Sequence, residues 1–268
     1  MSATISPFAE FCLTRVGRVG RMGLEALDAS AWLREEPGDA DLLAERARLL
    51  AERRSEVMAW TPDSTEAVAE LAREVEAWLR QRGRVGLLGQ TLADGEVEER
   101  LARLAVTVAE DLCLIDVGAP EPRLIAGVVC FPNRWSLGEK IGASMVWIHR
   151  PVPEYANRLA VPVDRFLQTL DPGMARGRLN WSLCGHSDWF QAYHPEREPD
   201  IDGPWLRLEW QTFRRLPASG AVLFAIRTLQ TPWRQAPQAT REDLLAQIAA
   251  MPPAWSAYKG IDGLRSRL

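Results

Sequence analysis

The segment from residue 205 to residue 229 constrains the fold more strongly than any other part of the chain. Apolar and polar residues alternate along residues 205–216, and a second apolar run follows at residues 221–229. A period of two is typical of a strand with one buried face, and the loop Pro-Ala-Ser-Gly at residues 217–220 has the composition of a turn. We therefore expect an antiparallel hairpin here, and an antiparallel sheet at the centre of the fold.

Helical patterns dominate the chain up to about residue 110, and short β-branched runs follow. We expect strands at residues 112–117, 124–131, 179–184, 205–216 and 221–229. Helices are expected at residues 39–58, from 63 or 64 to about 79, and at 96–109, 154–170 and 241–251. The sequence therefore predicts one α+β domain over residues 1–268, with a five-stranded antiparallel sheet, a helical N-terminal extension (about 1–110) and a C-terminal helix.

The composition argues against several classes of partner. The chain has 268 residues, a net charge of −4 and a pI of about 5.6, so neither nucleic acid nor an anionic membrane surface is expected to bind. No apolar run approaches the ~20 residues of a membrane helix, and residues 1–13 lack the pattern of a signal peptide. The four cysteines are scattered, which favours free thiols in a reducing, cytoplasmic environment.

His149 is the strongest candidate for a metal ligand among the three histidines, the others being His186 and His194. It ends the apolar run 145–148 and precedes Arg-Pro-Val-Pro at residues 150–153, where two prolines restrict the backbone. Such an imidazole can bind a metal through one nitrogen while a carbonyl orients the other, although a lone apolar histidine is more often a core residue. Because no carboxylate cluster accompanies it, haem iron is favoured over zinc or non-haem iron.

A polar stripe on the first hairpin strand is the second candidate site. Arg207, Glu209 and Gln211 fall on one face of this strand, with aromatic residues at both ends of the stripe. Such a stripe fits a solvated sheet face and a cavity wall equally well. In a cavity, Glu209 would accept a proton or pair with a cationic amine, Arg207 would hold its orientation, and Arg227 of the neighbouring strand would lie close by.

Two smaller signals accompany this stripe. Asn180, followed by Trp181 on the preceding strand, is placed where it could line the same face. Lys140 is a candidate for binding a haem propionate, although a solvated helix lysine is the simpler interpretation.

Several sequence blocks occur in a fixed order between residues 110 and 260. They are Phe131-Pro132-x-x-Trp135, Glu139-Lys140-Ile141-Gly142, Ile148-His149-x-Pro151-Val152-Pro153, Asn180-Trp181, Arg207-x-Glu209-x-Gln211-Thr212-Phe213-x-x-Leu216-Pro217, Phe224-x-Ile226-Arg227-Thr228 and Tyr258-Lys259-Gly260. In content and order these blocks resemble the alpha subunit of haem-dependent oxidative N-demethylases. The helices before residue 110 resemble this family more loosely.

The resemblance implies a PAS-like fold, in which a five-stranded antiparallel sheet cradles a b-type haem. It implies that His149 is the proximal iron ligand. It also implies that Glu209, Arg207 and Arg227 act on the oxygen-facing side. The cofactor-binding residues that it implies besides His149 are Lys140, Trp135, Asn180 and Gln211.

The activity implied by the resemblance is a haem-dependent monooxygenase reaction, the oxidative N-demethylation of a small amine with O₂. The chain has no flavin or nicotinamide fingerprint and no iron–sulfur cysteines, so electrons are expected from a separate flavin or iron–sulfur reductase or a ferredoxin-type donor. The alternatives are a haem-based gas or redox sensor and a haem-binding protein without turnover. A PAS-like binding domain without haem and a homo-oligomeric assembly also stay open.

Trp210 departs from the family pattern. The family usually reads Glu-Arg-Gln where this chain reads Glu209-Trp210-Gln211. If the family's arginine acts in the pocket, the exchange implies a different substrate or no demethylase activity. Strand alternation instead places Trp210 on the opposite face from Glu209, where the exchange would alter only packing or a partner surface.

Overall fold

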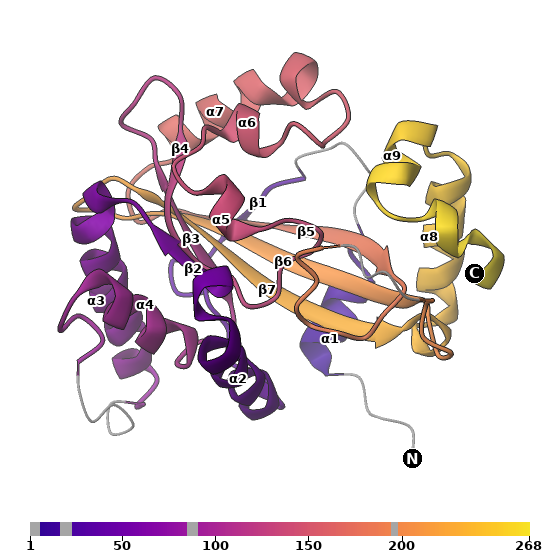
Figure 1. Cartoon of the computed structure of the whole chain (residues 1–268), viewed down its shortest axis with the longest axis horizontal. Coiled ribbons are helices and arrows are strands. Elements are labelled where there is room, and N and C mark those ends of the chain that lie inside the picture. Colours follow the sequence, from indigo (N-terminus) through magenta and orange to yellow (C-terminus); the bar gives the residue numbers. More distant parts are fainter. Residues whose placement is uncertain (1–5, 17–22, 85–90, 194–197) are drawn as a thin grey trace.

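Seven strands form one antiparallel sheet in the computed structural model, which describes residues 6–16, 23–84, 91–193 and 198–268 (Figure 1). The order across the sheet is β1-β5-β6-β7-β3-β4-β2, and each neighbouring pair is antiparallel. The strands are β1 (Glu25–Leu27), β2 (Met58–Trp60), β3 (Asp111–Asp116), β4 (Arg123–Val128), β5 (Ala175–Cys184), β6 (Trp205–Arg215) and β7 (Val222–Pro232).

The five strands predicted from the sequence are all present, but the predicted number of strands is wrong. β1 and β2 add a short strand at each edge of the sheet. Each has three residues, too few for a period of two to be recognised, and β2 follows directly on a helix. The N-terminal part of the chain, predicted to be a helical extension, therefore also supplies both edges of the sheet.

Helices precede, interrupt and follow the long strands. The N-terminal helices are α1 (Pro7–Leu13), α2 (Asp39–Val57), α3 (Thr65–Gln81) and α4 (Val97–Ala105), and α2, α3 and α4 lie where the sequence predicts helices. Between β4 and β5 lie α5 (Leu137–Lys140), α6 (Met145–Ile148), a π-helical turn (Tyr155–Leu159) and α7 (Ala160–Thr169). The chain continues after β7 with α8 (Gln238–Ala249) and α9 (Pro253–Tyr258), and 3₁₀ turns occur at Pro62–Ser64, Trp233–Gln235 and Asp262–Arg267.

In the described ranges, no helix combines the length and the apolar character that crossing a bilayer requires.

Different parts of the chain cover the two faces of the sheet (Figure 1). Helices α2, α3 and α4 pack on one face around apolar residues such as Leu112 and Leu223. Helix α1 packs on the same face, against Trp210. The segment α5–α7 covers the opposite face, where Phe213 and Phe224 contribute to the packing. This second face carries the site described below.

Trp210 points away from the face that α5–α7 cover. Its indole is 3% exposed and packs edge-on against Phe8 and Phe11 of α1, with ring centroids 6.3 and 5.3 Å away. It also lies against Gly177, where a Cβ atom would be 2.6 Å from Cζ2 of the indole. The tryptophan that departs from the family pattern therefore determines packing against α1, as strand alternation predicts.

Candidate functional site

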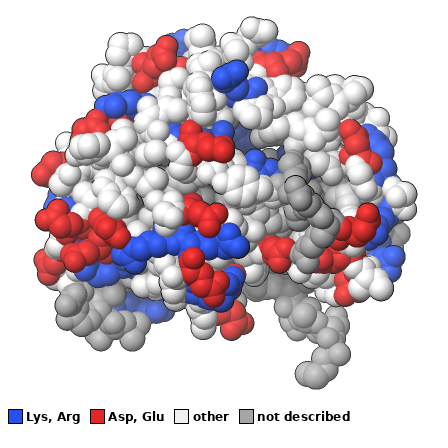
Figure 2. Space-filling view, in the orientation of Figure 1, with Lys and Arg blue, Asp and Glu red and all other residues white. Residues whose placement is uncertain are grey.

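A cavity of about 790 Å³ lies between the sheet and the segments that contain α5–α7 and α9. Its apolar walls include Phe213, Phe224 and Ile226 of the sheet and Phe166 of α7. Figure 2 shows a hollow in this side of the molecule, with basic side chains inside it. The volume falls within the ~300–1,000 Å³ that small-molecule and cofactor sites usually have.

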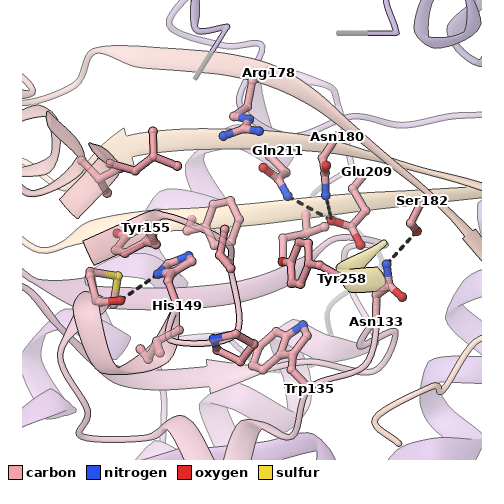
Figure 3. A pocket seen from close by; sticks show the side chains of 18 of the residues that line it. Asn133, Trp135, His149, Tyr155, Arg178, Asn180, Ser182, Glu209, Gln211 and Tyr258 are labelled. Atoms are coloured by element: carbon pink, nitrogen blue, oxygen red, sulfur yellow. Dashed lines mark hydrogen bonds between the residues drawn. The ribbon is translucent and has the colours of Figure 1, made fainter. Parts of the chain in front are cut away.

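His149 lies in this cavity directly after α6, as the C-cap residue of that short helix. Its Nδ1 atom is 2.8 Å from the carbonyl oxygen of Met145. A carbonyl oxygen only accepts hydrogen bonds, so Nδ1 carries the proton and Nε2 keeps its lone pair. The ring also stacks on Tyr155, with centroids 4.4 Å apart and an angle of 9° between the planes (Figure 3). One hydrogen bond and one stacked ring thus fix the orientation of the imidazole.

The charge state of His149 suits metal binding. Burial lowers the pKa of His149 to about 4, the charges of Lys140 and Arg178 lower it further, and the hydrogen bond to Met145 opposes the shift. The imidazole is therefore neutral near pH 7, which is the form that binds metals. Lys140 donates a 2.5 Å hydrogen bond to the carbonyl oxygen of Ile148 and so holds the residue before His149.

The polar stripe of β6 forms one wall of the cavity. Glu209 Oε2 accepts hydrogen bonds from Asn180 Nδ2 at 3.2 Å and from Gln211 Nε2 at 2.9 Å (Figure 3). All three residues line the cavity. The solvated sheet face that the sequence left open is thus not what the structure shows, because α5–α7 and α9 cover this part of the sheet.

The two arginines predicted beside Glu209 do not line the cavity. Arg207 is fully buried behind Glu209, with 3.7 Å between its Nε and Oε1 of the carboxylate, and it donates to the carbonyl oxygens of Phe131 and Trp189. It can hold Glu209 but does not reach the cavity.

The expectation that Arg227 lies near the polar stripe is wrong. The strand register places Arg227 opposite Trp210, on the face that packs against the N-terminal helices. There it forms an ion pair with Asp39 and lies 4.0 Å from a carboxylate oxygen of Glu110. Arg227 is thus an internal structural residue on the far side of the sheet.

Several residues that line the cavity carry no predicted role. Tyr258 and Lys259 lie at the end of α9, and Arg178 lies on β5. The block Tyr258-Lys259-Gly260 belongs to the resemblance, but no periodic pattern predicts its position in the fold. Arg178 was detectable, because it lies two residues before Asn180 and therefore on the same face of the strand.

Lys259 ties α9 to the polar wall. Its Nζ atom donates to Asn180 Oδ1 at 3.0 Å and to the carbonyl oxygen of Trp181. Burial lowers the pKa of Lys259 to about 7, and the charge of Glu209 opposes this shift. Lysine, amide and carboxylate thus form a continuous chain of hydrogen bonds from Lys259 through Asn180 to Glu209.

Basic residues outnumber acidic ones in the described lining of the cavity. Four carry a basic side chain, Arg134, Lys140, Arg178 and Lys259, and one, Glu209, is acidic. The predicted cofactor-binding residue Trp135 also lies in the lining. Of the other histidines, His186 bonds to Asp200 outside the cavity, and His194 lies outside the described residues.

These features define an α+β protein with a basic, aromatic-walled pocket, into which one oriented and neutral imidazole projects. A family model described as "Haem-dependent oxidative N-demethylase, alpha subunit-like" matches residues 84–268. The chain belongs to this family, as the sequence blocks indicate. The match includes the central five strands and every described lining residue except Leu24.

Proposed function

We propose that this protein is a haem-dependent monooxygenase that removes an N-methyl group from a small amine by oxidation. The observation that carries the proposal is the state of His149 within a cavity of a protein of this family. Its imidazole is neutral, Nδ1 is hydrogen-bonded, and Nε2 forms no hydrogen bond with the described residues. A haem iron takes one axial histidine of this kind.

The residues of the cavity fit a b-type haem. A porphyrin needs apolar walls, and Phe166, Phe213 and Phe224 provide aromatic ones. Its two propionates need cationic partners, and Lys140 is a basic lining residue close to His149 in the sequence. The central antiparallel strands, covered on one face by α5–α7, support the PAS-like architecture that the resemblance implies.

The bound haem would supply the activation of O₂ and the oxidation of the methyl carbon. The residues of this chain would bind and orient. Tyr155 and the Met145 carbonyl would hold the imidazole, and Glu209 would bind the ammonium group of the substrate. Asn180, Gln211 and, from behind, Arg207 hold the Glu209 carboxylate toward the cavity and fix its position.

The overall reaction balances with two external electrons. One O₂, two electrons and two protons convert one N-methyl amine to the demethylated amine, formaldehyde and water. The electrons would come from a separate flavin or iron–sulfur reductase or a ferredoxin-type protein. The words "alpha subunit-like" in the family description support the presence of partner subunits.

The test is a turnover assay with the haem-loaded protein, a reductase system and a panel of N-methyl amines. Formaldehyde and demethylated amine appearing in equal amounts, one of each per O₂ consumed, is the expected result. The rival function is a haem-based sensor, which the same pocket would fit. Stable haem binding and O₂ binding, with no product from any amine despite electron delivery, would favour the sensor and contradict the oxygenase.

A further inference from the structure

Arg178 is a cation on the polar wall of the cavity that forms no ion pair with the described residues. It lies on β5, two residues before Asn180, and its side chain projects into the cavity (Figure 3). Its Nε atom is buried and has no hydrogen-bond partner in the described part of the chain. No carboxylate of that part lies within 4.0 Å of its guanidinium. A guanidinium with a buried, unsatisfied donor of this kind is costly unless a ligand supplies the acceptor.

The surrounding groups do not complete this guanidinium. Glu209 is the acidic residue of the described lining, and its carboxylate is engaged by Asn180, Gln211 and Arg207. Lys259 differs from Arg178, because it already donates to two oxygen atoms of the protein. Lys140 likewise donates to a carbonyl oxygen. Arg178, unlike these two lysines, has a buried donor that no acceptor in the described part of the chain satisfies.

We propose that Arg178 is the carboxylate-binding residue of the cavity. A guanidinium presents parallel N–H donors whose spacing matches the two oxygens of a carboxylate. Two ligands could bring this group: the haem, through a propionate, or the substrate, through an acid group of its own. Binding of a haem propionate rests on the function proposed above. Binding of a substrate carboxylate does not, so it tests the role of Arg178 independently.

The strand register shows how a substrate could use this site. Arg178 pairs with Gln211 and Asn180 pairs with Glu209, so Arg178 and Glu209 are diagonal neighbours on adjacent strands. Diagonal neighbours on one face have Cα atoms roughly 7–8 Å apart, within reach of long side chains. An N-methylated α-amino acid carries its ammonium and carboxylate groups one carbon apart. Its ammonium group would bind Glu209 and its carboxylate would bind Arg178. A simple dialkylamine has no carboxylate and would bind only Glu209.

The first arm of the test measures whether the propionates bind Arg178. Iron-free protoporphyrin IX and its dimethyl ester are titrated into the protein, with quenching of tryptophan fluorescence as the readout, because Trp135 and Trp181 line the cavity. If a propionate binds Arg178, the wild type prefers the diacid by about tenfold or more. Arg178→Met removes the preference and Arg178→Lys restores part of it. Arg176→Met, on the same strand but outside the lining, keeps it.

The second arm measures the binding of N-methylglycine and of dimethylamine. Binding is detected by the shift of the haem spectrum or, in the haem-free protein, by the increase in thermal stability. If the substrate carboxylate binds Arg178, Arg178→Met weakens binding of N-methylglycine about tenfold and leaves dimethylamine unchanged. A positive result in either arm supports the proposal and identifies the source of the carboxylate.

The proposal would be overturned if Arg178→Met bound both the porphyrin diacid and N-methylglycine as tightly as the wild type does. It would also be overturned if the wild type bound neither of the two ligands. If the wild type binds neither haem nor porphyrin but binds N-methylglycine through Arg178, the oxygenase proposal is contradicted and the role of Arg178 is supported.

Discussion

The imidazole of His149 stacks on the ring of Tyr155, with the two planes 9° apart and the centroids separated by 4.4 Å. The two residues are joined by the loop after α6, and Tyr155 begins the π-helical turn that leads into α7. Nδ1 of the imidazole is hydrogen-bonded to the carbonyl oxygen of Met145. The hydrogen bond and the stacked ring together leave the imidazole little freedom to rotate. Stacking of this kind acts in the same way as the outer-shell partners that orient metal-binding histidines.

Loss of this stacking should weaken haem binding. We expect Tyr155→Leu to raise the dissociation constant for haem about tenfold, in the range typical when an orienting neighbour of a ligand is lost. Tyr155→Phe is the matched control. It keeps the ring, and the hydroxyl that it removes is buried without a hydrogen-bond partner in the described structure, so haem affinity and stability should be retained. Haem titrations followed at the Soret band compare the three proteins, and equal weakening by both variants would contradict a role for the ring.

Glu209 should determine amine binding and not haem binding. Glu209→Gln keeps the size of the side chain and removes its charge, so we expect the amine-induced change in the haem spectrum to be lost while haem affinity stays the same. Glu74→Gln, at a carboxylate that binds Arg214 away from the cavity, is the control. Retention of amine binding by Glu209→Gln would show that the ammonium group binds elsewhere.

Lys259 should give the protein a stability that rises with pH above 7. Its pKa is lowered from 10.5 to about 7 in the folded protein, chiefly by burial. Between these values the unfolded chain binds one more proton than the folded one, so the free energy of unfolding increases with pH from about 7 upward. Urea denaturation at pH 7.0, 7.75 and 8.5 measures the slope. We expect Lys259→Met to reduce it, and an identical slope in the variant would contradict the lowered pKa.

Gly177 should be required because of Trp210. A Cβ atom at residue 177 would lie 2.6 Å from Trp210 Cζ2 and 3.0 Å from Leu27 Cδ1. Gly177→Ala should therefore destabilise the protein by about 1–3 kcal/mol, as overpacking usually does. In the double variant with Trp210→Leu the clash with the indole is absent, so the two effects should not add. Additive losses in chemical denaturation would show that the two residues do not interact. Haem binding should persist in both single variants, since Trp210 faces away from the cavity.

Strand alternation explains how much of the site the sequence could predict. Glu209 and Gln211 share a face because of their spacing along β6, and Trp210 falls on the other face for the same reason. Asn180 joins them through the register of β5 with β6. The position of Arg227 was not predictable in this way. Whether a residue of β7 shares a face with Glu209 depends on the register of the hairpin, and a shift of one residue moves every side chain to the opposite face.

Other parts of the site depend on tertiary contacts that no local pattern encodes. Lys259 reaches Asn180 across 79 positions of the sequence, carried there by the packing of α9. The edge strands β1 and β2 are defined by their pairing with β5 and β4 and not by their own three residues. The sequence could therefore single out His149 and the polar wall, whereas the contribution of α9 to the cavity and the edges of the sheet required the structure.

The central claim is that His149 holds haem in this cavity, and a haem titration of wild type beside His149→Gly tests it most directly. We expect the wild type to give a sharp Soret band at one haem per chain, and the variant to lose it or to bind haem with a shifted band. Added imidazole should restore the wild-type spectrum to His149→Gly, and His186→Ala should behave as wild type because its side chain lies outside the cavity. A His149→Gly variant with unchanged haem affinity and an unchanged Soret band would contradict the claim.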